Sequence, residues 1–284
     1  MNNLPSKLFN PLLKTLPLLA LFVAALISTT GCGASSTTTR TLALPANFDQ
    51  TQPVFIDINL FRGNVIVAED PSLTNIQIKR SFHSRTNPWR VDQNLDINDD
   101  LKHSIDFIDY QAYLTRTTSG QPACVVTAST AYPYPDEQWV NVDVIAPKIL
   151  GLNIQTTDGD ITAANITAPF NISNNHGNII VSTTHPIADK INLITADGHI
   201  DLRISTRSTG SINITAVNGR AAIDAPTNTP FKIRHPDPQH AYATLNPGPN
   251  AMILQTTSGN ARVIITENPA KISPVKKLSL PVRP

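Results

Sequence analysis

Acidic and imidazole side chains flank a series of glycines in the second half of the chain, where they could support metal binding or acid–base chemistry. They are Asp158, Asp160, His176, Asp197, His199 and Asp201. Carboxylates and imidazoles held on rigid neighbouring strands can ligate Ca²⁺ or Zn²⁺. Asp, Asn and His immediately before glycine are also ordinary turn residues, and the chain has no calcium-binding nonapeptide repeat. We therefore expect these residues to shape turns, and we predict no metal site and no cofactor.

An aromatic, proline-bearing segment at 131–139, AYPYPDEQW, is a candidate binding contact. Tyr132, Tyr134 and Trp139 could form a platform that stacks on a sugar or contacts a protein, as exposed aromatic side chains often do. Trp139 has a second interpretation, in which it covers the core at the start of its strand.

Signatures of common enzyme classes are missing from the sequence. There is no H-E-x-x-H, G-x-S-x-G, C-x-x-C or phosphate-binding glycine loop. The alternative that stays open is a carbohydrate-active β-helix enzyme, which would cleave a polysaccharide with clustered carboxylates. Residues that fit this alternative are scattered over different segments: Asp99, Asp100, His176 and Arg203. We expect a non-enzyme with no catalytic residues.

A repeat of about 20 residues positions most of these side chains. A glycine marks each copy: Gly159, Gly177, Gly198, Gly219 and Gly259. In the copy around Gly198, Ile191 and Leu193 precede the turn, while Ile200 and Leu202 follow it. Apolar residues two apart lie on the same face of a strand, so each copy predicts two short strands joined by a glycine turn.

Such a unit cannot bury its apolar face alone, but it can when it is stacked on copies of itself. The repeat therefore predicts an all-β fold, a parallel β-helix or β-solenoid with rungs of about 20 residues. A meander of hairpins is the competing interpretation. Asparagines between the two apolar columns should point outward or form a stacked amide ladder: Asn153, Asn171, Asn192 and Asn213.

The remaining sequence divides the chain into segments. We expect a signal peptide at 1–31, a flexible Ser/Thr-rich tether at 32–40, an irregular β-rich part of the solenoid at 41–147, the repeat solenoid at 148–267 and a Pro/Lys-rich tail at 268–284. The stretch VFIDINLFRGNVIVAE at 54–69 repeats the glycine pattern around Gly63.

Composition narrows the class of protein further. The formal net charge is +1 and charged residues make up 15% of the chain, so nothing favours nucleic acid as a partner. Of the two cysteines, Cys124 lies in an apolar run and should be a small buried residue.

A leading strand–glycine–strand unit, the segment VNVDVIAP at 140–147 and the serial glycine units together resemble the bacterial putative-adhesin β-strand-repeat family. The resemblance covers roughly 41–265. It implies an extracytoplasmic β-solenoid with an adhesive or structural role, whose partner would be a glycan or another envelope protein.

The N-terminus resembles the lipobox of bacterial lipoproteins. Lys7 and Lys14 precede an apolar run, and small residues lead to Gly31 and Cys32, although Thr29 replaces the usual leucine. The resemblance implies that Cys32 is lipidated and anchors the protein in a membrane. Gly33 follows, where aspartate would imply retention in the inner membrane, so we expect the outer membrane.

Overall fold

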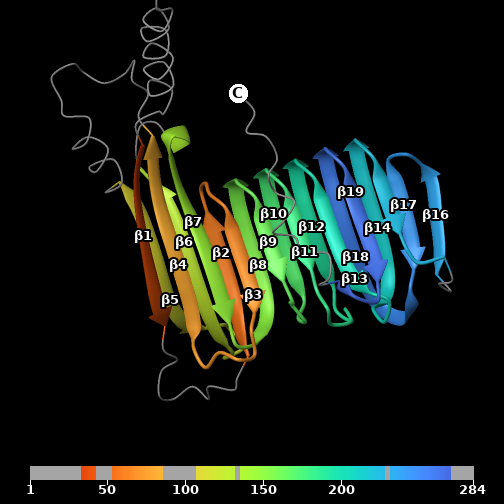
Figure 1. Cartoon of the computed structure of the whole chain (residues 1–284), viewed down its shortest axis with the longest axis horizontal. Helices are drawn as coiled ribbons and strands as arrows, with labels where there is room; N and C mark the ends of the chain where they lie inside the picture. The colour runs from red at the N-terminus through yellow and green to blue at the C-terminus, as the bar shows by residue number, and fades with distance from the viewer. Residues whose placement is uncertain (1–32, 43–52, 86–106, 132–134, 228–230, 270–284) are drawn as a thin grey trace, which may run out of the picture.

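The computed structural model describes residues 33–42, 53–85, 107–131, 135–227 and 231–269 (Figure 1). This part of the chain is all-β apart from short turns, one of which is the 3₁₀ turn η2 (Pro135–Glu137). None of its helical segments has the length and apolar character needed to cross a membrane. The expected signal peptide lies outside the described residues, as does the tail beyond residue 269.

Two long sheets face each other. Sheet A has nine strands in the order β1 (Gly33–Leu42), β4 (Ile76–Arg85), β7 (Gln138–Ala146), β3 (Val65–Glu69), β9 (Ile161–Ala164), β11 (Ile179–Ser182), β13 (Ile200–Ser205), β19 (Ala261–Thr266) and β15 (Ala221–Asp224). Sheet B has ten strands in the order β16 (Lys232–Asp237), β17 (His240–Thr244), β14 (Thr209–Asn218), β18 (Asn246–Ser258), β12 (Ile191–Asp197), β10 (Phe170–His176), β8 (Ile149–Asp158), β2 (Val54–Leu60), β6 (Pro122–Thr130) and β5 (Ile108–Arg116).

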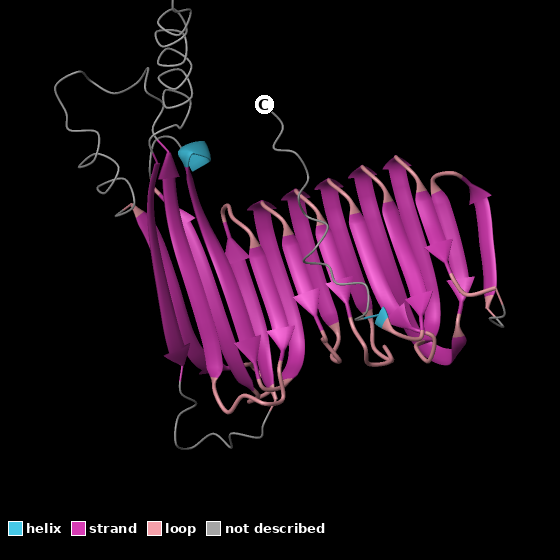
Figure 2. Cartoon of the chain, in the orientation of Figure 1, coloured by secondary structure: helices cyan, strands magenta, loops and turns pink. Residues whose placement is uncertain are grey.

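Each rung of the structure is a strand of sheet B, a turn and a strand of sheet A, as Figure 2 shows. Neighbouring rungs pair in parallel and in register, so Ile172 of β10 lies between Ile154 of β8 and Leu193 of β12. Alternate side chains point inward, and these three are fully buried. The predicted parallel β-solenoid is confirmed, and the stretch around Gly63 forms one of its rungs through β2 and β3.

The rungs are not stacked in the order of the sequence. Strands β18 and β19, the last repeat, lie between the rung of β12 and β13 and the rung of β14 and β15. At the other end, β6 and β7 lie outside β2 and β3, which precede them in the chain. Figure 1 shows this order in the blue strands β18 and β19, which lie beside the cyan β12 and β13.

Two asparagines hold the inserted repeat in place. Asn246 donates from Nδ2 to the carbonyl oxygens of Thr206 and Ser208, at 3.0 and 2.9 Å. Asn250, which is 9% exposed, donates to the Thr209 carbonyl at 2.8 Å. These bonds join the connection between β13 and β14 to the first residues of β18. They give hydrogen-bond partners to backbone carbonyl groups at the point where the inserted repeat meets its neighbours.

Antiparallel strands close both ends of the solenoid. At the C-terminal end the hairpin of β16 and β17 covers the edge of β14, and β16 carries Lys232, Arg234 and Pro236, residue types that discourage further pairing. At the N-terminal end β5 pairs with β6, and β1 pairs with β4. Between the sheets there, the Arg80 guanidinium lies 4.6 Å from the ring centre of Tyr110.

The tether predicted for 32–40 is wrong at residues 33–40, and Cys32 lies outside the described residues. Residues 33–42 form β1, which pairs antiparallel with β4 from Gly33 opposite Arg85 to Leu42 opposite Ile76. Ser and Thr suggested a flexible linker, but Thr is β-branched and favours extended backbone.

Candidate functional site

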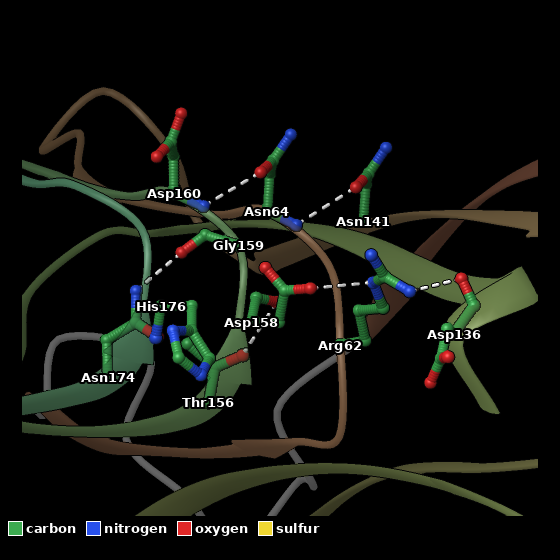
Figure 3. Close-up of polar contacts among 10 residues, drawn as sticks. All are labelled: Arg62, Asn64, Asp136, Asn141, Thr156, Asp158, Gly159, Asp160, Asn174 and His176. Carbon is green, nitrogen blue, oxygen red and sulfur yellow. Dashed lines mark hydrogen bonds and ion pairs between the residues drawn. The ribbon is translucent and has the colours of Figure 1, made fainter. Parts of the chain in front are cut away.

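The glycine turns line up along one edge of the solenoid, part of which Figure 3 shows. Gly159 has a φ of +136°, and an added Cβ would lie 2.1 Å from the carbonyl oxygen of Gly63 in the neighbouring rung. Gly177 has a φ of +129° and stands in the same relation to Gly159, at 2.2 Å. Both the backbone conformation and the contact between rungs therefore require glycine at these turns.

A hydrogen-bond ladder runs along this edge through the residue that follows each glycine. Asn64 Oδ1 accepts the backbone N–H of Asp160 at 2.9 Å, and Asp160 Oδ1 accepts that of Asn178 at 2.8 Å. Members of this turn ladder are Asn64, Asp160, Asn178, His199, Asn260 and Arg220, and Asn141, which follows no glycine, begins it by accepting the Asn64 N–H. His199 accepts the Asn260 N–H at Nδ1, so its imidazole proton is on Nε2. Asp160 and His199 thus serve the stacking of the rungs.

A second polar column lies inside the turns. Asn174 Nδ2, Thr195 Oγ1 and Thr256 Oγ1 donate to the carbonyl oxygens of the neighbouring Gly159, Gly177 and Gly198, at 2.6, 3.2 and 2.9 Å. All three donors are buried. Sequence reasoning missed this column, although the aligned repeats carry the signal: a Thr or Asn recurs three residues before the glycine in four of the five copies.

The residues before the glycines form an outward row of charged and polar groups. The Arg62 Nε lies 2.9 Å from Asp158 Oδ2, and its Nη1 donates to the carbonyl oxygen of Asp136 (Figure 3). Further along, His176 Nδ1 lies 3.9 Å from Asp197 Oδ2, with both side chains largely exposed. From Arg62 to Asp197 a basic or imidazole side chain separates successive carboxylates, so no two carboxylates stand on adjacent rungs and repel each other.

Trp139 lies on the outer face of sheet A, not over the core. Its ring stacks on the His83 ring with 5.1 Å between centres and 8° between planes. Burial lowers the pKa of His83, which favours the neutral ring, and Asn141 Nδ2 lies 3.2 Å from His83 Nε2. The pair thus stands at the end of the turn ladder, half-buried and next to Asn141. Tyr132 and Tyr134, predicted to act with Trp139, lie outside the described residues, as do Cys32, Asp99 and Asp100.

The acidic and imidazole residues singled out in the sequence occupy separate positions. Asp158 pairs with Arg62, Asp160 and His199 belong to the turn ladder, and Asp201 pairs with Arg203 at 2.8 Å on the outer face of sheet A. Within the described ranges, no three His, Cys, Asp or Glu side chains converge in a way that would hold a metal ion.

On the outer face of sheet B, asparagines stack into an amide row. Asn171 Nδ2 donates to Asn153 Oδ1 at 3.0 Å, and Asn192 Nδ2 donates to Asn171 Oδ1 at 2.9 Å. The row ends on the Asp57 carboxylate, which accepts from Asn153 at 2.8 Å. The predicted ladder is confirmed for these three asparagines. Asn213 is not part of it, because the inserted β18 places Ile253 between Asn192 and Asn213.

A hollow of about 400 Å³ lies beside the amide row. At one side of the hollow the Phe55 ring leans over Gly151 so closely that an added Cβ would lie 2.7 Å from the ring. The hollow is lined by Phe55, Leu152, Asn153, Pro169, Phe170, Asn171, Lys190 and Asn192. Sequence reasoning did not identify this site, since Phe55 and Lys190 meet only through the pairing of β2, β8, β10 and β12.

With the repeat geometry in place, comparison with known proteins assigns the fold to a family. Residues 140–264 match the family model of Toastrack DUF4097. This part of the chain belongs to the Toastrack family. The resemblance inferred from the serial glycine units is thereby confirmed, and the Toastrack domain contains every member of the turn ladder except Asn64, together with all three asparagines of the amide row.

Several solved structures resemble the chain. A putative cell adhesion protein from Clostridium sporogenes has a TM-score of 0.47 and 10% identity, with 82% of this chain and 99% of that chain covered. A putative adhesin from Bacteroides fragilis has a TM-score of 0.28 and 9% identity, with coverage of 80% and 97%. A putative adhesin from Parabacteroides merdae has a TM-score of 0.26 and 11% identity, with coverage of 84% and 95%. No curated protein matches the sequence.

Proposed function

We propose that this protein is a non-catalytic lipoprotein of the bacterial cell envelope whose solenoid walls bind a partner. The observation that carries the proposal is the structural use of the acidic groups at the turn edge. Asp158 is engaged by Arg62, and Asp160 accepts hydrogen bonds from both the backbone and the side chain of Asn178. Carboxylates with these partners are poorly placed to exchange protons with a substrate.

Glycoside cleavage requires two carboxyl groups, one of which stays protonated and donates its proton to the leaving group. Among the described residues, Asp143 is the carboxyl whose pKa is raised, by burial, and Lys79 acts against that rise. Its cross-strand neighbours on sheet A are Lys79 and Ile66. Neither supplies the second carboxylate, so the geometry around Asp143 favours a binding wall over a catalytic centre.

The expected lipid at Cys32 would place the solenoid close to a membrane. Since β1 begins at Gly33, no spacer separates the proposed acyl acceptor from the folded domain. Gly33 pairs with Arg85 at the end of β4, and the preceding Ser84 pairs with Gln138, the first residue of β7. This end of sheet A is the one at which the glycine turns lie. A lipid on Cys32 would therefore hold this edge toward the bilayer and leave the two walls open to the surroundings.

The binding function is tested by assaying the purified full chain against a panel of polysaccharides for the release of reducing ends. We expect none to be released. The double variant Asp158→Asn with Asp160→Asn should retain any binding that the wild type shows. Release of reducing ends that disappears in the double variant would contradict the proposal and favour the β-helix enzyme.

The anchor is tested separately with Cys32→Ser. We expect the wild-type protein to fractionate with outer membranes and to carry acyl mass on its N-terminal peptide, because several acyl chains hold a protein at a bilayer. The variant should be exported without lipid or remain unprocessed. A soluble wild-type protein without acyl mass would contradict the lipoprotein proposal.

A further inference from the structure

The hollow on sheet B combines an apolar row with a polar row. In the first row, Phe55 pairs with Gly151, and Gly151 is followed across the strands by Pro169 and Lys190. Two residues further along the strands, the second row is Asp57 with the amide row of Asn153, Asn171 and Asn192. Both rows lie on the outer face, because the residues between them, such as Leu152 and Phe170, are buried.

The first row offers a flat apolar surface. The Phe55 ring is half-buried against Gly151, and this close approach exists because glycine lacks a side chain. Pro169 continues the surface on the next rung and is exposed. An aromatic face beside a proline ring suits the C–H face of a pyranose sugar, which is flat and carries few polar atoms.

The second row offers hydrogen bonds at the spacing of the strands, about 4.8 Å. Each ladder bond uses one of the two N–H groups of an asparagine amide, so Asn153, Asn171 and Asn192 each keep an N–H for an external acceptor. Each Oδ1 also keeps a lone pair. The bonds along the row fix the amide planes before any ligand arrives, which lowers the entropic cost of binding.

The charge of the residues that line the hollow indicates which class of ligand it suits. Lys190 is the one charged side chain among the residues that line the hollow, and it is exposed. The nearest carboxylate in the second row, Asp57, accepts the hydrogen bond of Asn153. A single lysine next to hydroxyl-binding amides matches a ligand with many hydroxyl groups and one carboxylate per unit.

We propose that this hollow binds acidic saccharides, with one sugar ring stacked on Phe55, its hydroxyl groups bonded to the amide row and its carboxylate at Lys190. The proposal rests on the binding function proposed above and names its ligand class. A peptide strand fits this wall less well, because the backbone groups of β8 and β10 are already paired on both sides. Nucleic acid would require a row of cations, whereas the hollow has one.

The test is isothermal titration calorimetry on the full chain in detergent micelles, with trisaccharides of galacturonate, glucuronate and mannuronate and with their neutral methyl esters. We expect at least one acid to bind more tightly than its ester. Phe55→Ala should weaken the binding of both forms about tenfold, through lost stacking and apolar contact. Lys190→Gln should remove the preference for the acid and leave the affinity for the ester unchanged.

Tyr242→Ala is the matched control, since Tyr242 is a 40% exposed aromatic residue on the same sheet, in β17. It should bind as the wild type does. Gly151→Ala tests the role of the Phe55 ring independently, because the new Cβ displaces this ring without removing it. Each variant should melt within a few degrees of the wild type.

Binding to none of the three acids would overturn the saccharide proposal, as would Phe55→Ala and Lys190→Gln variants that bind like the wild type. Neither result would contradict the non-catalytic function. Failure of that function has its own signature, the release of reducing ends, which is measured on the same ligand solutions.

Discussion

At the scale of single residues, the solenoid depends on groups that contact their counterparts in the next rung. A Cβ on Gly177 would lie 2.2 Å from the Gly159 carbonyl oxygen, and one on Gly198 would lie 1.9 Å from that of Gly177. Beside them, Thr195 donates to the Gly177 carbonyl from inside the turn. Each turn is therefore fitted to its neighbour, and a change in one affects at least two rungs.

Gly177→Ala should destabilise the protein by at least about 3 kcal/mol, because backbone strain alone costs 1–3 kcal/mol and the clash with Gly159 adds to it. Gly120→Ala is the control: Gly120 has a φ of +80°, but nothing lies within 4 Å of an added Cβ. It should cost about 1 kcal/mol. Urea denaturation measures both values. Equal losses would show that the contact between turns is not tight.

Cys124 gives a prediction on pH. Burial raises the pKa of its thiol from 9.0 to about 12. The unfolded chain therefore loses this proton at a lower pH than the folded chain, and the stability should fall above pH 9, by up to about 1.4 kcal/mol per pH unit. Tyrosines and lysines titrate in the same range, so the measurement is the difference between wild type and Cys124→Ala in denaturation at pH 8 and pH 10.5. A difference that does not change with pH would contradict the burial of the thiol.

Much of the residue-scale pattern could be predicted from the sequence. The apolar columns, the glycines and the outward asparagines follow from period-2 alternation and turn chemistry. Thr195 and Asn174 were missed as buried donors, because Thr and Asn also suit exposed positions and their partner carbonyls come from another rung. The Phe55 hollow was missed for the same reason: it requires knowing which strands are neighbours.

At the scale of strands and rungs, the structure depends on which face each residue occupies. Ile200 is 1% exposed in β13, whereas Asn192 points outward from β12 and donates to Asn171. A substitution at Ile200 acts on the core, and one at Asn192 acts on the amide row.

Ile200→Asp should unfold the domain, since an unpaired buried charge costs several kcal/mol. Asn192→Asp should cost about 1 kcal/mol, because it replaces the donor to Asn171 with a carboxylate oxygen. Ile194→Asp, at a half-buried outward position of the same strand, is the control for a charge on the wall. Thermal unfolding followed by circular dichroism ranks the three variants. A larger loss for Asn192→Asp than for Ile200→Asp would reverse the assigned faces.

The strand at 33–42 shows where composition misleads. Its Ser and Thr residues resemble a linker, yet β1 pairs along its full length with β4. Whether a polar stretch forms an edge strand depends on the availability of an unpaired neighbour, and local sequence does not contain that information.

At the scale of the whole molecule, the main departure from the sequence order is the position of the last repeat. The apolar columns are nearly the same in all copies, so exchanging two rungs leaves the core almost unchanged. The hairpin of β16 and β17 turns the chain back along β14, and β18 then enters between β14 and β12. The insertion also ends the amide row, because it places Ile253 next to Asn192.

The order of the rungs is tested most directly by pairs of cysteines in a Cys124→Ala background. In the structure, Asn192 and Ile253 are neighbours on adjacent parallel strands, so Asn192→Cys with Ile253→Cys should form a disulfide on mild oxidation, with Cα atoms about 4.8 Å apart. Asn192→Cys with Asn213→Cys should stay reduced, because an intervening strand separates these residues by roughly 10 Å. Mass spectrometry of the oxidised peptides reports both. A disulfide between 192 and 213, with none between 192 and 253, would show that the rungs follow the sequence order and would contradict the fold described above.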